Sequence, residues 1–305
     1  MARNSALQTL VSVDQRPELG PDIYSNHGPL VHQIGGNAFG GSIISQAVSA
    51  AAATVAPGFN LYSSQSSFLR PIKADLKVDY QVDRTADGRR FATRTVRATQ
   101  GARDGRCLYT AILSFQKSGD SDGVLTYCDP MPAVDGTSPY DVPRQGFRQF
   151  GFQAQGSPES SADGTDDGEP FEWRLLPFEP AQQPLQMRAR GFVRSALLAT
   201  ESQAIQSACM AFVSDVNLLE LALLTNWEAV PENMQSLAMS TTLTHHILLH
   251  SPTPKANEWM VCESGTSGGA DGRILLQQRF WDFATGRLVM SCLQEALSET
   301  PGARL

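Results

Sequence analysis

The chain carries one sequence pattern twice, and this repeat limits the possible folds more than any other feature. The segment 87–116, DGRRFATRTVRATQGARDGRCLYTAILSFQ, has a counterpart at 271–297, DGRILLQQRFWDFATGRLVMSCLQEAL. Each copy has an Asp-Gly-Arg turn, an alternating strand, a second turn that ends in Gly-Arg, and another strand. Because Asp-Gly favours hairpin turns and the flanking Val, Thr, Phe and Leu suit half-buried strands, each copy predicts a β-hairpin.

A helix and an extended segment are expected ahead of each hairpin. In the first half, residues 37–58 are rich in Ala and almost free of charge, which is typical of a helix enclosed by other elements, and a Pro-Gly pair ends them. In the second half, the TESQ sequence at Thr200 predicts a capping box, and apolar pairs follow at helical spacing. The extended segments are 61–71 and 240–252. The chain is therefore predicted to be an α+β protein with two halves built alike.

Composition restricts the class of protein and of partner. The 305 residues are 41% hydrophobic and 18% charged, so the chain can bury a large core. A net charge of −7 without a Lys/Arg cluster argues against nucleic acid or an anionic membrane as the main partner. No apolar run is long enough to span a bilayer, and residues 1–20 lack the apolar segment of a secretory signal, so an intracellular protein is expected. The five cysteines are scattered without a CxxC pair, so we expect neither a disulfide framework nor a zinc site.

The most informative single residue is Asp215, a carboxylate inside the mostly apolar segment 208–224, ACMAFVSDVNLLELALL. Moving an unpartnered carboxylate out of water is costly. Asp215 is therefore expected to lie at the edge of the core, to accept hydrogen bonds as a structural cap, or to serve in chemistry. This residue by itself does not separate the three interpretations.

Several segments of the chain, in order and in spacing, resemble the type II acyl-CoA thioesterases. They are FGGSIISQAV (39–48), SSFLRP (66–71), VDRTADGRRFATRTV (82–96), LSFQ (113–116), FVSDVNLLE (212–220), TTLTHHILLH (241–250), NEWMV (257–261) and QEAL (294–297). The resemblance implies a double hotdog, in which two tandem hotdog repeats each have a helix wrapped by an antiparallel sheet. It places one hotdog at 22–118 and the other, with the catalytic residues, at 173–298. A partly disordered linker at 119–172 and a tail at 299–305 complete the expected organisation.

The resemblance also implies a set of functional residues. In the family, an Asp on the second helix, a Thr or Ser on the following strand and a Gln on the last strand direct water onto the thioester; here they are Asp215, Thr242 and Gln294. No covalent nucleophile and no cofactor are expected. Backbone N–H groups at a helix N-terminus would bind the thioester oxygen. The residues expected to bind the substrate are Phe39, Gly40, Gly41 and Phe68. Singly, the same three polar residues are equally consistent with a helix cap and two ordinary strand residues.

Two departures from the family pattern leave the reaction open. Thr244 precedes His245 where the family commonly has Asp-His, and Gln65 stands where it commonly has His. Both changes remove an ionisable group near the expected site. Three functions follow: an acyl-CoA hydrolase as the leading interpretation, a lyase or cyclase acting on a thioester or polyketide-like intermediate, and a non-catalytic acyl-binding module.

The remaining histidines of the second extended segment predict no metal site. Because side chains alternate along a strand, His246 and His250 are expected on the same face as Thr242 and Thr244. Further metal ligands are not evident in the sequence, so satisfied or partly exposed histidines are the better interpretation. A homo-oligomer is compatible with the sequence.

The tripeptide Ala303-Arg304-Leu305 has the small, basic, leucine pattern of a peroxisomal targeting signal. Pro301 and Gly302 would keep it free of the last strand, as a signal read by an import receptor must be. We therefore expect the peroxisomal import receptor as a partner and the peroxisome as the location, with the cytoplasm as the alternative.

Overall fold

The computed structural model of the chain describes residues 6–101, 105–119, 127–144, 170–177, 184–186, 188–195, 198–218 and 239–299. The first half contains α1 (Ala6–Val11), β1 (Val13–Gln15), β2 (Ile23–Asn26), η1 (Ile34–Gly36), α2 (Gly40–Ala52), β3 (Phe59–Phe68), β4 (Val78–Asp87), β5 (Phe91–Gln100) and β6 (Tyr109–Lys117). The second half contains η2 (Pro139–Asp141), β7 (Glu172–Leu175), η4 (Pro184–Gln186), β8 (Arg188–Arg194), α3 (Gln203–Val213), β9 (Met239–Leu249), β10 (Met260–Ala270), β11 (Arg273–Asp282) and β12 (Leu288–Glu299).

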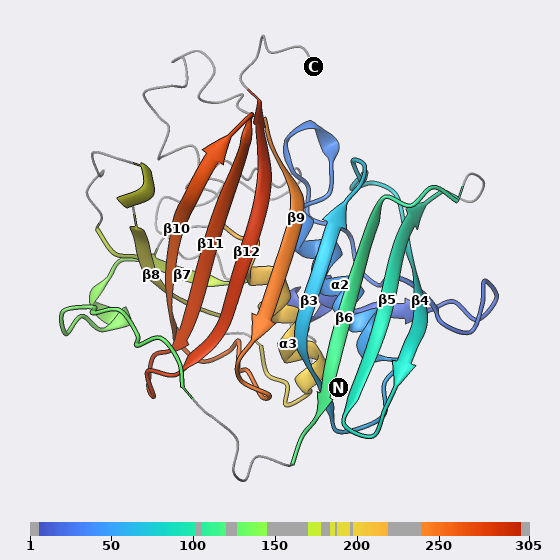
Figure 1. Cartoon of the computed structure of the whole chain (residues 1–305), viewed down its shortest axis with the longest axis horizontal. Helices are drawn as coiled ribbons and strands as arrows, with labels where there is room; N and C mark the ends of the chain where they lie inside the picture. The colour runs from blue at the N-terminus through green and yellow to red at the C-terminus, as the bar shows by residue number, and fades with distance from the viewer. Residues whose placement is uncertain are drawn as a thin grey trace.

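The strands of the described residues join one antiparallel sheet, and the two halves meet at its centre. Its twelve strands follow the order β1-β2-β4-β5-β6-β3-β9-β12-β11-β10-β8-β7. Read outward from the β3–β9 pair, each half repeats the same order of elements (Figure 1). The duplicated hairpins of the sequence are β5–β6 and β11–β12. The prediction of an α+β fold with two halves built alike is confirmed.

The two halves also share a β-bulge, which lies in β3 in the first half and in β9 in the second. In β3, Leu61 and Ser63 pair with adjacent residues of β6, so one extra residue forms a β-bulge. In β9, Thr242 and Thr244 pair with adjacent residues of β12 in the same way. Because the two bulges lie at equivalent points of the two halves, positions in one half can be matched with those in the other.

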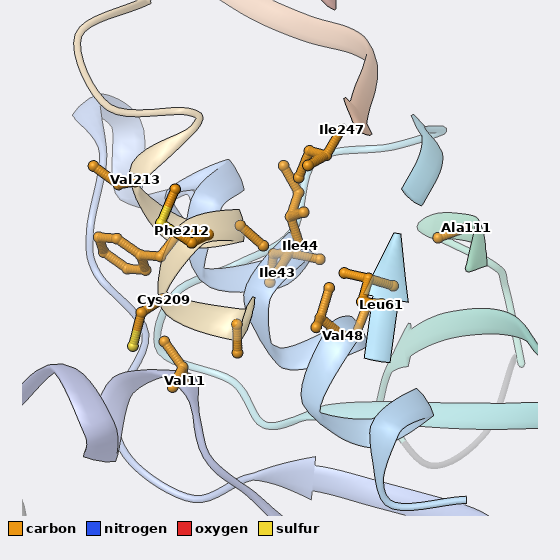
Figure 2. Close-up of a cluster of buried hydrophobic side chains, with 14 of the residues drawn as sticks. Val11, Ile43, Ile44, Val48, Leu61, Ala111, Cys209, Phe212, Val213 and Ile247 are labelled. Atoms are coloured by element: carbon orange, nitrogen blue, oxygen red, sulfur yellow. The ribbon is translucent and has the colours of Figure 1, made fainter. Parts of the chain in front are cut away.

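The core lies between the sheet and the helices α2 and α3, which lie behind the central strands in the view of Figure 1. Figure 2 shows Ile43 and Ile44 on α2, with Ile44 directed toward Ile247 of β9, while Phe212 projects from the other side of α3. These side chains are at most 1% exposed. Complete burial of an Ile stabilises a fold by about 1.5–3 kcal/mol, so this layer fixes both helices against the sheet. The enclosed first helix predicted from its composition is confirmed, although α2 is shorter than 37–58 and ends at Ala52.

The expected start of the second helix is wrong. The helix α3 begins at Gln203, with Ser202 as the N-cap and no side-chain capping bond. Thr200 lies in the preceding turn, where its Oγ1 accepts a hydrogen bond from the N–H of Ser202 at 3.2 Å. The Thr200 hydroxyl is therefore used in the turn, and the capping box does not form.

Part of the expected linker packs against the second half. Residues 120–126 and 145–169 lie outside the described residues, as do 219–238 and the tripeptide 303–305. In the described part of the linker, residues 127–144, the Asp129 carbonyl accepts a hydrogen bond from Trp281 Nε1 at 2.9 Å. Val142 joins a small buried cluster on the second half. No helix within the described ranges is long and apolar enough to cross a bilayer.

Candidate active site

Asp215 lies just beyond the last residue of α3, where this helix meets the N-terminus of α2. It is 3% exposed. The helix α2 has no capping side chain of its own, because its N-cap position is Phe39. The carboxylate of Asp215, which comes from the other half of the chain, stands at this helix end and meets its positive partial charge. The two halves are thus joined at a helix N-terminus as well as across the sheet.

Burial and hydrogen bonding act on Asp215 in opposite directions. Burial raises the pKa of its carboxyl from the ordinary 3.8 to about 7, whereas the N–H of Gly41 and the side chain of Gln294 lower it. Burial is the largest effect. Asp215 Oδ1 has no hydrogen-bond partner among the described residues. The site therefore contains a buried carboxylate whose pKa is close to neutral pH and whose Oδ1 is bonded to no described residue.

The start of α2 requires glycines because two oxygen atoms of the second half come very close to its backbone. A Cβ at Gly40 would lie 2.6 Å from Asp215 Oδ2, and a Cβ at Gly41 would lie 2.7 Å from the Phe212 carbonyl oxygen. Only glycine leaves room for both contacts. The sequence-based interpretation gave the N–H groups around these glycines to the thioester oxygen. The Gly41 N–H instead donates toward Asp215, because that carboxylate occupies the helix end.

Gln294 connects the polar residues of the site. From the inward face of β12 it donates through Nε2 to Thr242 Oγ1 at 2.6 Å. Its side chain also donates toward Asp215. Gln294 is 0% and Thr242 is 8% exposed, so both belong to the same buried cluster. Asp215, Thr242 and Gln294, expected from the sequence as one set, are brought together by the fold.

His245 is a member of this cluster that the sequence analysis missed. It is 0% exposed, and its Nδ1 lies 3.0 Å from Gln294 Oε1. On the other side of the ring, Nε2 lies 2.9 Å from Ser214 Oγ. The distance from Nδ1 to Asp215 Oδ1 is 3.9 Å, too long for a hydrogen bond. His245 is therefore linked to Asp215 indirectly, by the hydrogen bonds that Gln294 makes to both residues.

The bulge in β9 explains why His245 was missed, and it overturns one prediction. Plain alternation places His246 and His250 on the face of Thr242. The extra residue at the bulge reverses the alternation, so that His245 and Ile247 turn inward while His246 and His250 are exposed. The expectation that Thr242 shares a face with His246 and His250 is wrong. A bulge of this kind leaves no clear mark in a single sequence.

The residues expected to bind the substrate lie around the same helix end. Phe68 is partly buried, and its ring Cζ would be 3.3 Å from a Cβ at Gly40, which places it beside the site. Phe39 is 1% exposed and packs its ring edge-to-face on Phe212, with the centroids 5.2 Å apart. Of the two rings, Phe68 is better placed to contact a ligand.

Within its described residues, the first half has no second copy of this polar cluster. At the bulge of β3, Leu61 takes the place of Thr242, and Ser64 takes that of His245. On β6, Leu113 takes the place of Gln294. A cavity of about 250 Å³ lies beside Leu61 at the opposite end of α2. Asn60 and Gln203 are among the residues that line this cavity, but none of the lining residues carries a carboxylate or an imidazole.

The cluster can activate water without a metal. Among the described residues, no three His, Cys, Asp or Glu side chains gather in a way that could hold a metal ion. A carboxylate with a pKa near 7, an amide and a hydroxyl can accept a proton from water and orient it toward an electrophilic carbon. This chemistry fits the hydrolysis of an activated ester.

Comparison with known proteins identifies the family. Residues 29–116 match the family model of the acyl-CoA thioesterase N-terminal domain, and residues 142–298 match that of the C-terminal domain. The chain belongs to the type II acyl-CoA thioesterase family. The second match starts within the expected linker and covers the whole polar cluster.

Individual relatives of this thioesterase agree with the family assignment. Acyl-coenzyme A thioesterase 8 of Homo sapiens is 29% identical over 276 residues, which cover 85% of this chain and 79% of that protein. Acyl-CoA thioesterase 2 of Haemophilus influenzae is 25% identical over 267 residues, with 85% and 86% covered. The solved structure of an acyl-CoA thioesterase II from Mycobacterium marinum has a TM-score of 0.74 and 21% identity and covers 98% of this chain and 99% of its own. That likeness supports the double hotdog fold.

Proposed function

We propose that this thioesterase hydrolyses acyl-CoA through a water molecule activated by Asp215. The observation that carries the proposal is the buried Asp215 carboxylate, which lies in one cluster with Gln294 and Thr242 and whose Oδ1 accepts no hydrogen bond from the described residues. The ionised carboxylate takes a proton from water as the water oxygen attacks the thioester carbonyl carbon. The tetrahedral intermediate then expels the CoA thiolate, which recovers the proton from Asp215. The products are a free acid and CoA.

The surroundings of Asp215 suit both steps. A general base is most effective when its pKa is close to the working pH, and a pKa of about 7 meets that condition. The N-terminus of α2 favours negative charge, whether on Asp215 or on the oxyanion that forms beside it. Gln294 and Thr242 supply the polar atoms that orient the water.

The proposal is tested with a panel of acyl-CoAs of different chain length and with detection of the released thiol. Hydrolysis of at least one substrate is expected, and it should be strongly reduced in Asp215→Asn. Mass spectrometry should find the free acid, which carries the added water. A product that retains the thioester would point to a lyase or cyclase. Absence of thiol release across the panel would contradict the proposal.

Thr242 and Gln294 are expected to act as one unit with Asp215. Thr242→Val and Gln294→Leu should each lower kcat by about 10-fold to 100-fold, because each loses a group that orients the water. When either substitution is combined with Asp215→Asn, the double variant should lose less activation free energy than the two single variants lose together. Steady-state kinetics of the single and double variants measures this coupling. Fully additive losses would show that the three residues do not share a water.

Peroxisomal delivery is a separate proposal, based on Ala303-Arg304-Leu305. A fluorescent protein that carries the last residues of this chain at its carboxyl terminus should become punctate in eukaryotic cells and co-localise with a peroxisomal marker. The same reporter without Leu305 should stay diffuse. Diffuse fluorescence from the intact tripeptide would rule out this signal and leave the cytoplasm as the expected location.

A further inference from the structure

The Gln294 amide also has a side that faces away from Asp215, toward His245. An amide side chain has one donor end and one acceptor end, and exchange of the two ends leaves its shape almost unchanged. In the site, Nε2 faces Thr242 and Asp215, while Oε1 faces His245 Nδ1. If the amide were reversed, Oε1 would face the Asp215 carboxylate, and two acceptors would meet in a buried place. The orientation of Gln294 therefore decides whether Asp215 has a donor beside it.

The imidazole of His245 can fix that orientation only in one form. Nδ1 must carry a hydrogen to donate to Gln294 Oε1, and Nε2 must then be an acceptor. Two groups that can donate lie near Nε2, and each has a second acceptor in reach. The Ser214 hydroxyl lies 2.9 Å from Nε2 and also donates to the Ala211 carbonyl at 2.9 Å, and the Cys292 thiol lies 3.7 Å from Nε2 and 3.5 Å from the Ser214 carbonyl. No carboxylate lies within hydrogen-bonding distance of either ring nitrogen among the described residues. The Gln294 Oε1 acceptor at 3.0 Å from Nδ1 is the contact that selects the tautomer with hydrogen on Nδ1.

The titratable groups around the site support a neutral ring. Burial lowers the pKa of His245 to about 4, although the contact with Gln294 raises it. Burial raises the pKa of Cys292 on β12 and of Tyr109 on β6, so both keep their protons at neutral pH. Charge repulsion from the side of His246 on β9 also lowers the pKa of His245 and so disfavours the charged ring. Asp215, by contrast, has a pKa of about 7.

We propose that His245 is a positioning residue of the thioesterase site: its Nδ1–H holds the Gln294 amide so that Nε2 donates toward Asp215. The inference rests on the proposed hydrolysis, because it assigns His245 a role in tuning the base of that reaction. His245 does not touch the water or the thioester. It acts through the hydrogen-bonded chain from Ser214 through the imidazole and Gln294 to Asp215.

The test compares two amides of different reach at position 245. The nitrogen of Asn can lie near the place of His Nδ1, whereas that of Gln reaches the place of Nε2. His245→Asn should keep kcat within a few-fold of the wild type and keep the acid limb of the kcat/KM profile. His245→Gln should lower kcat by about 10-fold to 100-fold and shift that limb to higher pH, because Asp215 loses a donor that lowers its pKa.

His246→Leu is the matched control, since its side chain is exposed on the opposite face of the same strand. It should change neither kcat nor the acid limb. Equal acid limbs in His245→Asn and His245→Gln, both folded by circular dichroism, would overturn the proposal and leave His245 as a core residue. If both variants fail to fold, the wild type still decides the question through the next measurement.

The ¹⁵N chemical shifts of His245 report its tautomer in the wild-type protein without any substrate. The expected result is a neutral ring with hydrogen on Nδ1 that persists down to about pH 5. A ring with hydrogen on Nε2, or one charged at pH 7, would overturn the proposal. Because this measurement needs no activity, it separates failure of this inference from failure of the proposed hydrolysis, which the acyl-CoA panel detects.

Discussion

Asp215→Asn is expected to lower kcat by about 10²–10⁴-fold with little change in KM. Asn keeps the shape of the side chain and can still accept a hydrogen bond from the Gly41 N–H at the start of α2. It cannot accept a proton from water. Steady-state kinetics on the best acyl-CoA of the panel measures the effect. The residual rate would come from binding and from the polar groups that remain.

The pH profile gives the same prediction a second readout. In the wild type, kcat/KM should rise with pH as Asp215 ionises, with a midpoint near pH 7. This rise of kcat/KM with pH should be absent in Asp215→Asn. Asp83→Asn, which removes an exposed carboxylate on β4, is the control and should leave the profile unchanged. An effect of Asp215→Asn confined to KM would assign Asp215 to substrate binding and remove it from the chemical step.

The repeat made most of this fold predictable from one sequence. Two hairpins with the same turns, each preceded by a helix, allow few arrangements other than two like halves, and the halves do share one order of strands. The meeting of β3 and β9 was not predictable in the same way. It depends on contacts between segments far apart in the chain, such as Ser66 Oγ with the His245 carbonyl at 2.9 Å.

The candidate site was only partly predictable, because two of its features arise from tertiary structure. Asp215, Thr242 and Gln294 could be selected by resemblance, and their residue types suit the chemistry. His245 could not, since its inward position depends on the bulge that reverses the alternation of β9. The contact of Asp215 with the start of α2 joins two halves of the chain, and the sequence offers no local sign of it beyond the glycine at position 40.

The buried base should also reduce the stability of the fold at high pH. The pKa of Asp215 is about 7 in the folded protein and near 3.8 when the chain is unfolded. Between these values the folded state binds more protons, so the contribution of this group to stability falls as pH rises from about 4 to 7. Above pH 7 the buried carboxylate is ionised and lowers the free energy of unfolding by its full amount, on the order of a few kcal/mol.

Asp215→Asn removes that titration and should make the protein more stable than the wild type at pH 8, by several degrees in Tm. At about pH 4, where the wild-type carboxyl is protonated when folded, the difference should shrink toward zero. Thermal unfolding of both proteins across this range gives the comparison, and Asp83→Asn again serves as the control. A variant less stable than the wild type at pH 8 would show that the ionised carboxylate stabilises α2 by more than its burial costs. The substitution with the largest loss of turnover is therefore also expected to be stabilising, because the fold keeps in its interior a charge that the reaction requires.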